Sequence, residues 1–134
     1  MGRINEIVFD CGSPAQLALF WSEVLADYTR RPYDIGELAR LDMLGLTPDT
    51  DTTVLLDGPG PSLCFQTVEG RRLDNNRVHV DVVADDRVEE TARLVELGAS
   101  IVRVLPTYTV LTDPEGNHFC LVDSEDAIMT IAAE

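Results

Sequence analysis

The sequence has few basic residues for its length. Of its 134 residues, 10 are Lys or Arg and 24 are Asp or Glu, so the formal net charge is −14 at pH 7. Nucleic-acid binding depends on Lys and Arg that displace counterions from phosphates, and anionic membranes attract the same side chains. We therefore expect neither nucleic acid nor a membrane as a partner, and the charge favours a cationic or neutral small-molecule ligand.

Long apolar runs and secretory features are also missing. No stretch approaches the roughly 18 apolar residues that a membrane span requires, and the first apolar run, residues 7–9, lacks the form of a signal peptide. The three cysteines, Cys11, Cys64 and Cys120, form no C-x-x-C pair. Such a set argues against a disulfide framework and against local zinc-finger or thioredoxin motifs. The expected location is the reducing cytoplasm.

Common phosphate-binding and nucleophile motifs are absent as well. The sequence contains no G-x-G-x-x-G, G-x-x-x-x-G-K or G-x-S-x-G, which argues against Rossmann, P-loop and α/β-hydrolase chemistry. The composition is 45% hydrophobic and 25% charged, as in an ordinary globular chain. The length predicts a single domain, 1–134, since domains commonly run roughly 100 to 200 residues.

What is present begins with a strand followed by a helix. Residues 4–11 are apolar and β-rich and end at Gly12. Ser13 and Gln16 then have the spacing of a capping box, with Pro in the first helical position. Apolar residues follow at the three-and-four spacing of an amphipathic helix, namely Leu17, Phe20, Trp21, Val24, Leu25 and Tyr28.

A second strand and helix repeat this order. Residues 78–84 alternate like a strand, and Asp86 and Glu89 form another capping-box pair. The helix that follows ends at Gly98 and carries an apolar stripe of Val88, Ala92, Val95 and Leu97. The two N-caps, Ser13 and Asp86, are 86 − 13 = 73 positions apart. Two independent landmarks share this offset, since Glu6 and His79 are also 79 − 6 = 73 apart, which indicates a duplicated unit.

Further strands complete each half. In the second half they are predicted at 100–105, 108–112 and 118–122, and in the first half at 52–56 and 62–68. If Cys64 and Cys120 occupy matching places, their offset is 56 and the first half carries 73 − 56 = 17 extra residues. The irregular segment 31–51 is the natural place for them, as a lid, a binding loop or a plain surface excursion. The prediction is an α+β fold of two βαβββ modules, about 1–70 and 76–123.

Strand alternation separates a packing face from a second face. Residues 78–84 place Val78, Val80 and Val82 on one side, which should pack against the helices. The same alternation in the other strands collects polar and ligand-capable side chains on the second side, namely Glu6, Asp10, Cys64, Gln66, His79, Asp81, His118 and Cys120. This second side is the candidate site.

Four stretches resemble a known superfamily. DPEGNHFCL at 113–121, NRVHVD at 76–81, FDCGSP at 9–14 and LCFQTVE at 63–69 are similar to the glyoxalase-like branch of the vicinal-oxygen-chelate superfamily, which includes glyoxalase I, bleomycin-resistance proteins and extradiol dioxygenases. The resemblance covers nearly the whole chain except residues 31–51. It implies paired βαβββ modules forming a cupped, mainly antiparallel sheet with helices on its outer face, and a homodimer.

The resemblance also implies where a metal would bind. Carried over residue by residue, the ligand positions of metal-dependent members are Glu6, His79 and Cys120. Cys120 stands where the chelating enzymes carry Glu, and a thiolate favours zinc or a similar soft metal. Because of this departure we expect no metal or other cofactor to be needed, with a divalent metal at these three residues as the alternative.

These observations lead to a functional hypothesis. A small organic ligand is expected in the cup, with His79 and Glu6 as catalytic acid–base groups if the protein is an enzyme of the lyase or isomerase type. The ligand-binding residues expected around them are Asp10, Cys64, Gln66, Tyr108 and Cys120. The function is then ligand sequestration or metal-free proton transfer. The alternatives are a metal-dependent lyase, isomerase or dioxygenase, and a non-catalytic dimeric interaction module.

Overall fold

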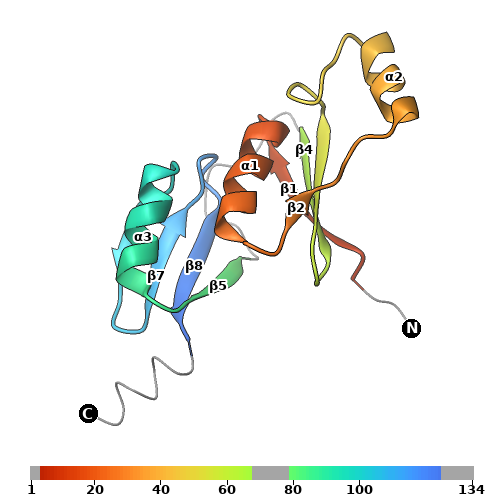
Figure 1. Cartoon of the computed structure of the whole chain (residues 1–134). Helices are drawn as coiled ribbons and strands as arrows, with labels where there is room; N and C mark the ends of the chain where they lie inside the picture. Colours follow the sequence, from red (N-terminus) through yellow and green to blue (C-terminus); the bar gives the residue numbers. More distant parts are fainter. Residues whose placement is uncertain (1–3, 68–78, 125–134) are drawn as a thin grey trace. The chain divides into compact units, whose positions relative to one another are not determined.

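The computed structural model describes residues 4–67 and 79–124. The chain divides into two compact units, Met1–Arg72 and Leu73–Glu134, and each is described by itself (Figure 1). No helix in the described ranges is both long and apolar enough to cross a lipid bilayer.

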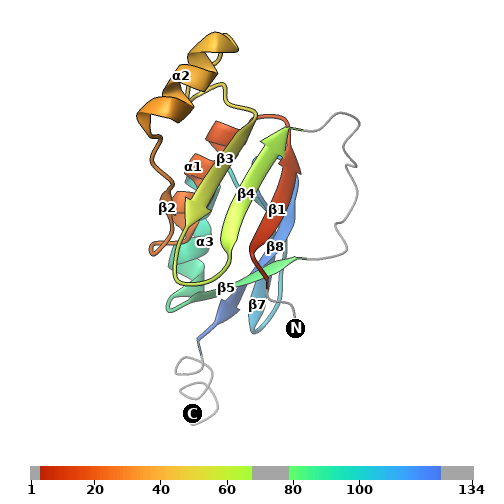
Figure 2. The ribbon, with the colours of Figure 1, turned by 90° about the vertical axis from the view of Figure 1, so that its right-hand side faces the viewer.

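The first unit is a four-stranded sheet with two helices. Its elements are β1 (Glu6–Cys11), α1 (Pro14–Val24), β2 (Thr29–Arg30), α2 (Ile35–Met43), β3 (Thr53–Asp57) and β4 (Ser62–Thr67). The strand order is β1-β4-β3-β2, with β1 parallel to β4 and the other pairs antiparallel (Figure 2).

The second unit repeats the strand order, without a counterpart of α2 among its described residues. Its elements are β5 (Val80–Ala84), α3 (Arg87–Glu96), β6 (Ser100–Val104), β7 (Tyr108–Thr112) and β8 (His118–Asp123). The order is β5-β8-β7-β6, again with one parallel pair, β5 and β8, and two antiparallel pairs. The predicted α+β fold of two βαβββ modules is confirmed.

Strand register confirms the duplication residue by residue. Val8 lies opposite Cys64 in the first sheet, and Asp81 lies opposite Cys120 in the second. The opening strands therefore match with an offset of 81 − 8 = 73, and the closing strands with 120 − 64 = 56. Both values equal the predicted ones, so the first unit carries 73 − 56 = 17 additional residues between these strands.

The segment 31–51 contains a helix that the hydrophobic pattern did not predict. Helix α2 buries only Leu41, while Ile35 and Leu38, which precede it at a spacing of three residues, are exposed. Its start is nevertheless written in the sequence, because Asp34 and Glu37 form a reciprocal capping box. The Glu37 backbone N–H donates to Asp34 Oδ1 at 2.7 Å, and the Asp34 N–H donates to Glu37 Oε1 at 3.5 Å.

The two other predicted caps differ from each other. Ser13 is the N-cap of α1 with Pro14 in the first turn, as predicted, but its side chain makes no capping bond, so the capping box predicted there is wrong. Asp86 does cap α3, accepting from the Glu89 N–H at 3.1 Å. In α1 the ring of Pro14 fixes the backbone of the first turn, which the capping bond would otherwise help to hold.

The core lies between the helices and the packing face of each sheet. Helix α1 buries the predicted stripe of Leu17, Phe20, Trp21 and Val24, and ends before Leu25. The Phe9 ring lies 5.3 Å from Trp21 and 5.0 Å from Phe65, measured between centroids. The aromatic cluster therefore joins β1, α1 and β4 into one core.

The stripe predicted for α3 is wrong. Val88 is 83% exposed, and the helix instead buries Thr91 and Leu94. The buried face is shifted by one residue because Arg87 turns inward and donates to Asp123 Oδ1 at 2.8 Å. Thr91 tolerates burial because its hydroxyl donates to the Arg87 carbonyl at 2.7 Å.

Candidate functional site

A row of four residues crosses the second sheet. Register places Asp81 opposite Cys120, Cys120 opposite Val110, and Val110 opposite Arg103. Residues directly opposite in a sheet share a face, so β5, β8, β7 and β6 each contribute one side chain to this surface. The predicted separation of faces is confirmed around it, since Phe119 and Leu121 on β8 are fully buried on the other side.

This surface is hollowed into a pocket of about 420 Å³. The lining residues all belong to the second unit and are His79, Asp81, Arg103, Tyr108, Val110, His118, Cys120 and Val122. Three residues predicted for the site, His79, Tyr108 and Cys120, are therefore brought together here. The lining combines apolar walls with a few polar groups, which is typical of small-molecule sites.

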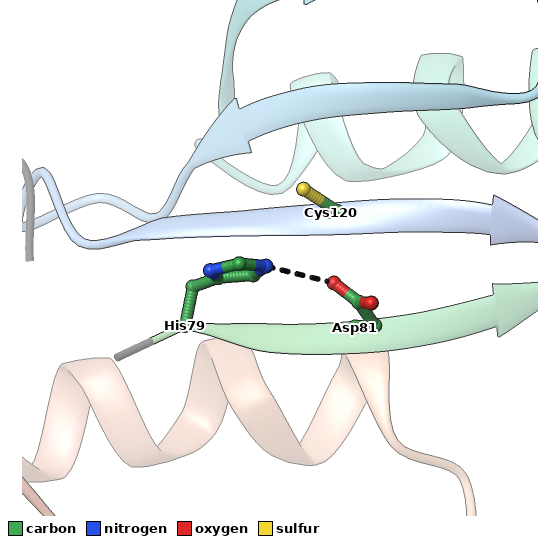
Figure 3. Close-up of side chains that lie close together, drawn as sticks. All are labelled: His79, Asp81 and Cys120. Carbon is green, nitrogen blue, oxygen red and sulfur yellow. Dashed lines mark ion pairs between the residues drawn. The ribbon is translucent and has the colours of Figure 1, made fainter. Parts of the chain in front are cut away.

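His79, Asp81 and Cys120 form the closest cluster in the pocket. Figure 3 shows His79 and Asp81 side by side, with the Cys120 thiol on the neighbouring strand. His79 Nε2 lies 3.1 Å from Asp81 Oδ1, and one ligand atom from each of the three residues lies within 4.8 Å of the others. Asp81 thereby fixes the orientation of the imidazole, leaving Nδ1 as the second nitrogen available for proton transfer.

The environment keeps the two predicted thiols protonated. Burial raises the pKa of Cys120, the Asp81 carboxylate raises it further, and the charge of Arg103 opposes the shift. Burial likewise raises the pKa of Cys64, with Glu6 adding to the effect. Because the thiolate is the nucleophile, both cysteines are poor nucleophiles near neutral pH. Cys120 in the pocket is therefore better suited to hydrogen bonding than to covalent catalysis.

The other predicted residues lie in the first unit. Asp10 and Gln66 are opposite each other in register, and Gln66 Nε2 donates to Asp10 Oδ1 at 3.1 Å. Cys64 lies beside them on β4 and is only 4% exposed. Glu6 opens β1 and is exposed. The convergence of these four residues with His79 and Cys120 in one cup stays a prediction.

An ion pair on the first sheet was not predicted. Arg31 donates from Nε and Nη2 to the two carboxylate oxygens of Asp57, both at 2.8 Å. Ser62 Oγ also donates to Asp57 Oδ1 at 2.7 Å. These bonds, that from Arg31 first, lower the pKa of Asp57 to about 2. Such bidentate geometry needs coordinates to detect, because 26 residues separate the partners in sequence.

Arg103 was the main residue missed in the second unit. Strand alternation could have identified it, but register shifts between Ile101 and Arg103, and this irregularity breaks the simple count along β6. His118, which strand alternation predicts on the second side, also lines the pocket. The pocket therefore contains one arginine and two histidines, although the net charge of the whole chain is −14.

The donor set of the cluster fits a metal ion. His79 offers nitrogen, Asp81 oxygen and Cys120 sulfur, a combination that suits zinc or a similar metal with a fourth position left open. The sequence predicts Glu6, His79 and Cys120 as metal ligands, whereas the cluster in the structure contains Asp81 in place of Glu6. Binding would require loss of the thiol proton and rearrangement of the His79–Asp81 pair.

Comparison with known proteins agrees with this architecture. The family model described as "Glyoxalase-like domain" matches residues 6–122. The chain therefore belongs to the glyoxalase-like domain family. Comparison with curated protein sequences finds no match.

Solved structures show the same fold at low sequence identity. A glyoxalase/bleomycin resistance protein/dioxygenase family enzyme from Burkholderia phytofirmans is 12% identical, with a TM-score of 0.68 over 91% of this chain and 98% of that one. A fosfomycin resistance protein from Listeria monocytogenes is 11% identical, with a TM-score of 0.64 over 92% and 94%. The trypanothione-dependent glyoxalase I of Leishmania major is 17% identical, with a TM-score of 0.62 over 99% and 94%.

Proposed function

We propose that this chain binds a small organic molecule in the pocket of its second sheet and that binding needs no metal. The observation that carries the proposal is the 420 Å³ pocket itself, in which polar groups from four strands and apolar walls converge. Pockets of roughly 300 to 1,000 Å³ are usual for small ligands. Val110, Val122 and Tyr108 supply the apolar contacts, and His79 and Cys120 supply directed hydrogen bonds.

The same groups allow proton transfer. Asp81 holds one nitrogen of His79, so the other can accept a proton from a bound carbon or oxygen acid. The protonated Cys120 thiol is a weak hydrogen-bond donor beside it. Glu6 is the second acid–base group of this proposal, and its part stays a prediction because it belongs to the first unit. Without turnover, the same pocket would sequester its ligand, as expected for a resistance protein.

A thermal-shift screen of metal-free protein against uncharged, anionic and cationic aromatic compounds tests this proposal. Ligands that bind only the folded state raise the melting temperature. We expect at least one compound to do so, and Val110→Trp, which fills the pocket, to abolish the shift. Val83→Trp, on an exposed position outside the lining, serves as the matched control.

Product formation from a bound compound would identify an enzyme, and persistent binding without product would identify a sequestering protein. Absence of any shift would contradict the proposal and favour an interaction module.

The second candidate function is a metal-dependent lyase, isomerase or dioxygenase. It is favoured by the cluster of His79, Asp81 and Cys120. A metal there would act as a Lewis acid toward a bound oxygen, while the chain's own residues would hold and orient the ligand. Elemental analysis of protein purified without chelator decides between the candidates. One equivalent of metal per chain, lost in Cys120→Ala and kept in Cys64→Ala, would establish the metal-dependent candidate and reject metal-independent binding.

Homodimer formation and a cytoplasmic location remain part of the proposal. Both rest on the family resemblance and on the composition of the sequence. Light scattering coupled to size-exclusion chromatography tests the first, and a mass of one chain would contradict it. Fractionation of cells that express the protein tests the second.

A further inference from the structure

Matching rows of the two sheets both end in arginine. In the second unit the row runs Asp81, Cys120, Val110, Arg103. In the first unit register gives Val8, Cys64 and Leu55, and the Arg31 N–H donates to the Leu55 carbonyl at 2.9 Å. Arg31 and Arg103 are therefore structural counterparts, each on the face that also carries a cysteine.

The first arginine is neutralised within its own sheet. Asp57 accepts two hydrogen bonds from Arg31, which is the strongest arrangement available to a guanidinium and a carboxylate. Asp57 therefore neutralises the charge of Arg31 and occupies its Nε and Nη2 donors.

The second arginine, Arg103, has no such partner among the residues that the structure describes. Leu56 lies opposite Leu63, and Leu111 lies opposite Phe119, the counterpart of Leu63 at the offset of 56. Leu56 and Leu111 are therefore matching positions, and so are the residues that follow them, Asp57 and Thr112. A neutral threonine stands where the first unit has its carboxylate. Within residues 4–67 and 79–124, the Arg103 guanidinium forms no ion pair or side-chain hydrogen bond, although it lines the pocket.

Two of the other exchanged positions remove a carboxylate from the second face. Glu6 corresponds to His79 at the offset of 73, and Ser62 corresponds to His118 at the offset of 56. Asp10 corresponds to Val83. One exchange adds a carboxylate, since Val8 corresponds to Asp81, and that carboxylate is paired with His79. The pocket is thus much less acidic than the chain as a whole.

We propose that the ligand of this pocket carries an oxyanion group, a carboxylate or a phosphonate, and that Arg103 binds it. This inference rests on the proposed function and names the chemical class of its ligand. The planar guanidinium matches two oxygens of such a group. Arg103 and Asp81 are three strand spacings apart, roughly 14 Å between backbones. The anionic end therefore lies toward β6, and the rest of the ligand extends toward His79 and Cys120. The local charges take precedence over the net charge, which had favoured a cationic or neutral ligand.

The test uses four matched probes: benzoate, phenylphosphonate, benzyl alcohol and benzylamine. Their affinities are measured by titration of metal-free protein, followed by NMR shifts of backbone amides in β6, β7 and β8. We expect the two anions to bind about 10- to 100-fold more tightly than the alcohol and the amine, because a charged hydrogen-bond pair is involved. The better of the two anions identifies the oxyanion class.

Two variants remove the available charge in different ways. Arg103→Gln deletes the guanidinium, and Thr112→Asp gives the second unit the carboxylate that neutralises Arg31 in the first. Both should weaken binding of the preferred anion by about 10-fold or more and leave the alcohol unchanged. Arg93→Gln, on the exposed side of α3, makes the same charge change away from the pocket and is the matched control. Thermal melting confirms that each variant is folded.

The outcomes separate the inference from the function on which it rests. If benzyl alcohol or benzylamine binds in the pocket at least as tightly as both anions, and Arg103→Gln changes nothing, the oxyanion inference is overturned while ligand binding stands. If no probe shifts pocket amides at millimolar concentration, the pocket does not act as a small-molecule site and both fail.

Discussion

The two units have the same strand order and register but different side chains on the open face of the sheet. On the packing face, Phe65 of β4 and Leu121 of β8 occupy matching positions, and both are fully buried. On the open face the matching residues differ. Asp57 of the first unit is replaced by Thr112 in the second, and Glu6 is replaced by His79. The packing face determines the fold in both units. The open face is where the units have diverged, and the pocket proposed for function lies on the second.

The largest expected effect concerns the shared packing face. Phe65→Ala and Leu121→Ala each remove a fully buried side chain, which should lower the free energy of unfolding by about 3–5 and 2–5 kcal/mol respectively. Urea unfolding followed by circular dichroism measures both. A loss below about 1 kcal/mol in either variant would show that the two packing faces do not contribute alike.

A difference between the helix starts gives the next largest effect. Arg87 begins α3 where the first unit has Pro14, since 87 − 73 = 14. Its side chain donates to Asp123 Oδ1, Thr109 Oγ1 and two carbonyls, and the Arg87–Asp123 side chains are only 13% and 9% exposed. Arg87→Ala should cost about 3 kcal/mol, because it leaves a largely buried carboxylate without its partner.

Arg93→Ala is the matched control for this prediction. Arg93 lies on the same helix but pairs with Glu90 at the exposed surface, where such pairs contribute at most about 1 kcal/mol. Equal losses of unfolding free energy in the two arginine variants would contradict a special role for Arg87.

The Arg31–Asp57 pair predicts a smaller, pH-dependent effect. The pKa of Asp57 falls from 3.8 to about 2 in the folded protein. A lowered carboxyl pKa stabilises the fold above the unfolded value, and this contribution is lost as the pH falls from about 4 to 2. Because Asp57 is 42% exposed, solvent screening reduces the effect to about 1 kcal/mol or less.

Asp57→Thr, which installs the residue of the second unit, tests this effect. Its unfolding free energy should lie below that of the parent protein at pH 7, and the difference should shrink toward pH 2. Urea titrations at both pH values give the comparison. A difference that grows on acidification would have the wrong sign for a lowered pKa.

The smallest effect concerns thiol reactivity. Asp81 raises the pKa of Cys120 and Arg103 lowers it. Alkylation by iodoacetamide near neutral pH should therefore become a few times faster in Asp81→Asn and slower in Arg103→Gln, since the thiolate is the reacting species. Mass spectrometry of the Cys120 peptide measures the rates, with Cys64 in the same sample as the internal reference. Changes in the same direction in both variants would show that these charges do not act on Cys120 as described.

The duplication was predictable because matching residues of the two units are separated by constant distances in the sequence. The offsets of 73 and 56 needed only the position of Glu6, His79 and the two strand cysteines. Helix α2 was detectable from its Asp34–Glu37 cap and from the three-residue spacing of Ile35, Leu38 and Leu41, although only Leu41 is buried. The stripe on α3 failed because a buried ion pair, rather than apolar periodicity, sets the rotation of that helix.

The candidate site was likewise only partly predictable from the sequence. Alternation placed His79, Asp81 and Cys120 on one face, and the structure brings them together. Arg103 was missed because a register shift in β6 moves it onto that face. That a threonine, Thr112, takes the place of the carboxylate of Asp57 in the described part of the second unit becomes visible only through strand register.

The most direct test of the account is an NMR titration of the whole chain with benzoate, comparing the matching rows of the two sheets. The account predicts that the largest amide shifts occur in the second row, at Arg103, Val110 and Cys120, and that Arg103→Gln weakens them. Larger shifts in the first row, at Arg31, Leu55 and Cys64, would contradict the assignment of ligand binding to the second unit.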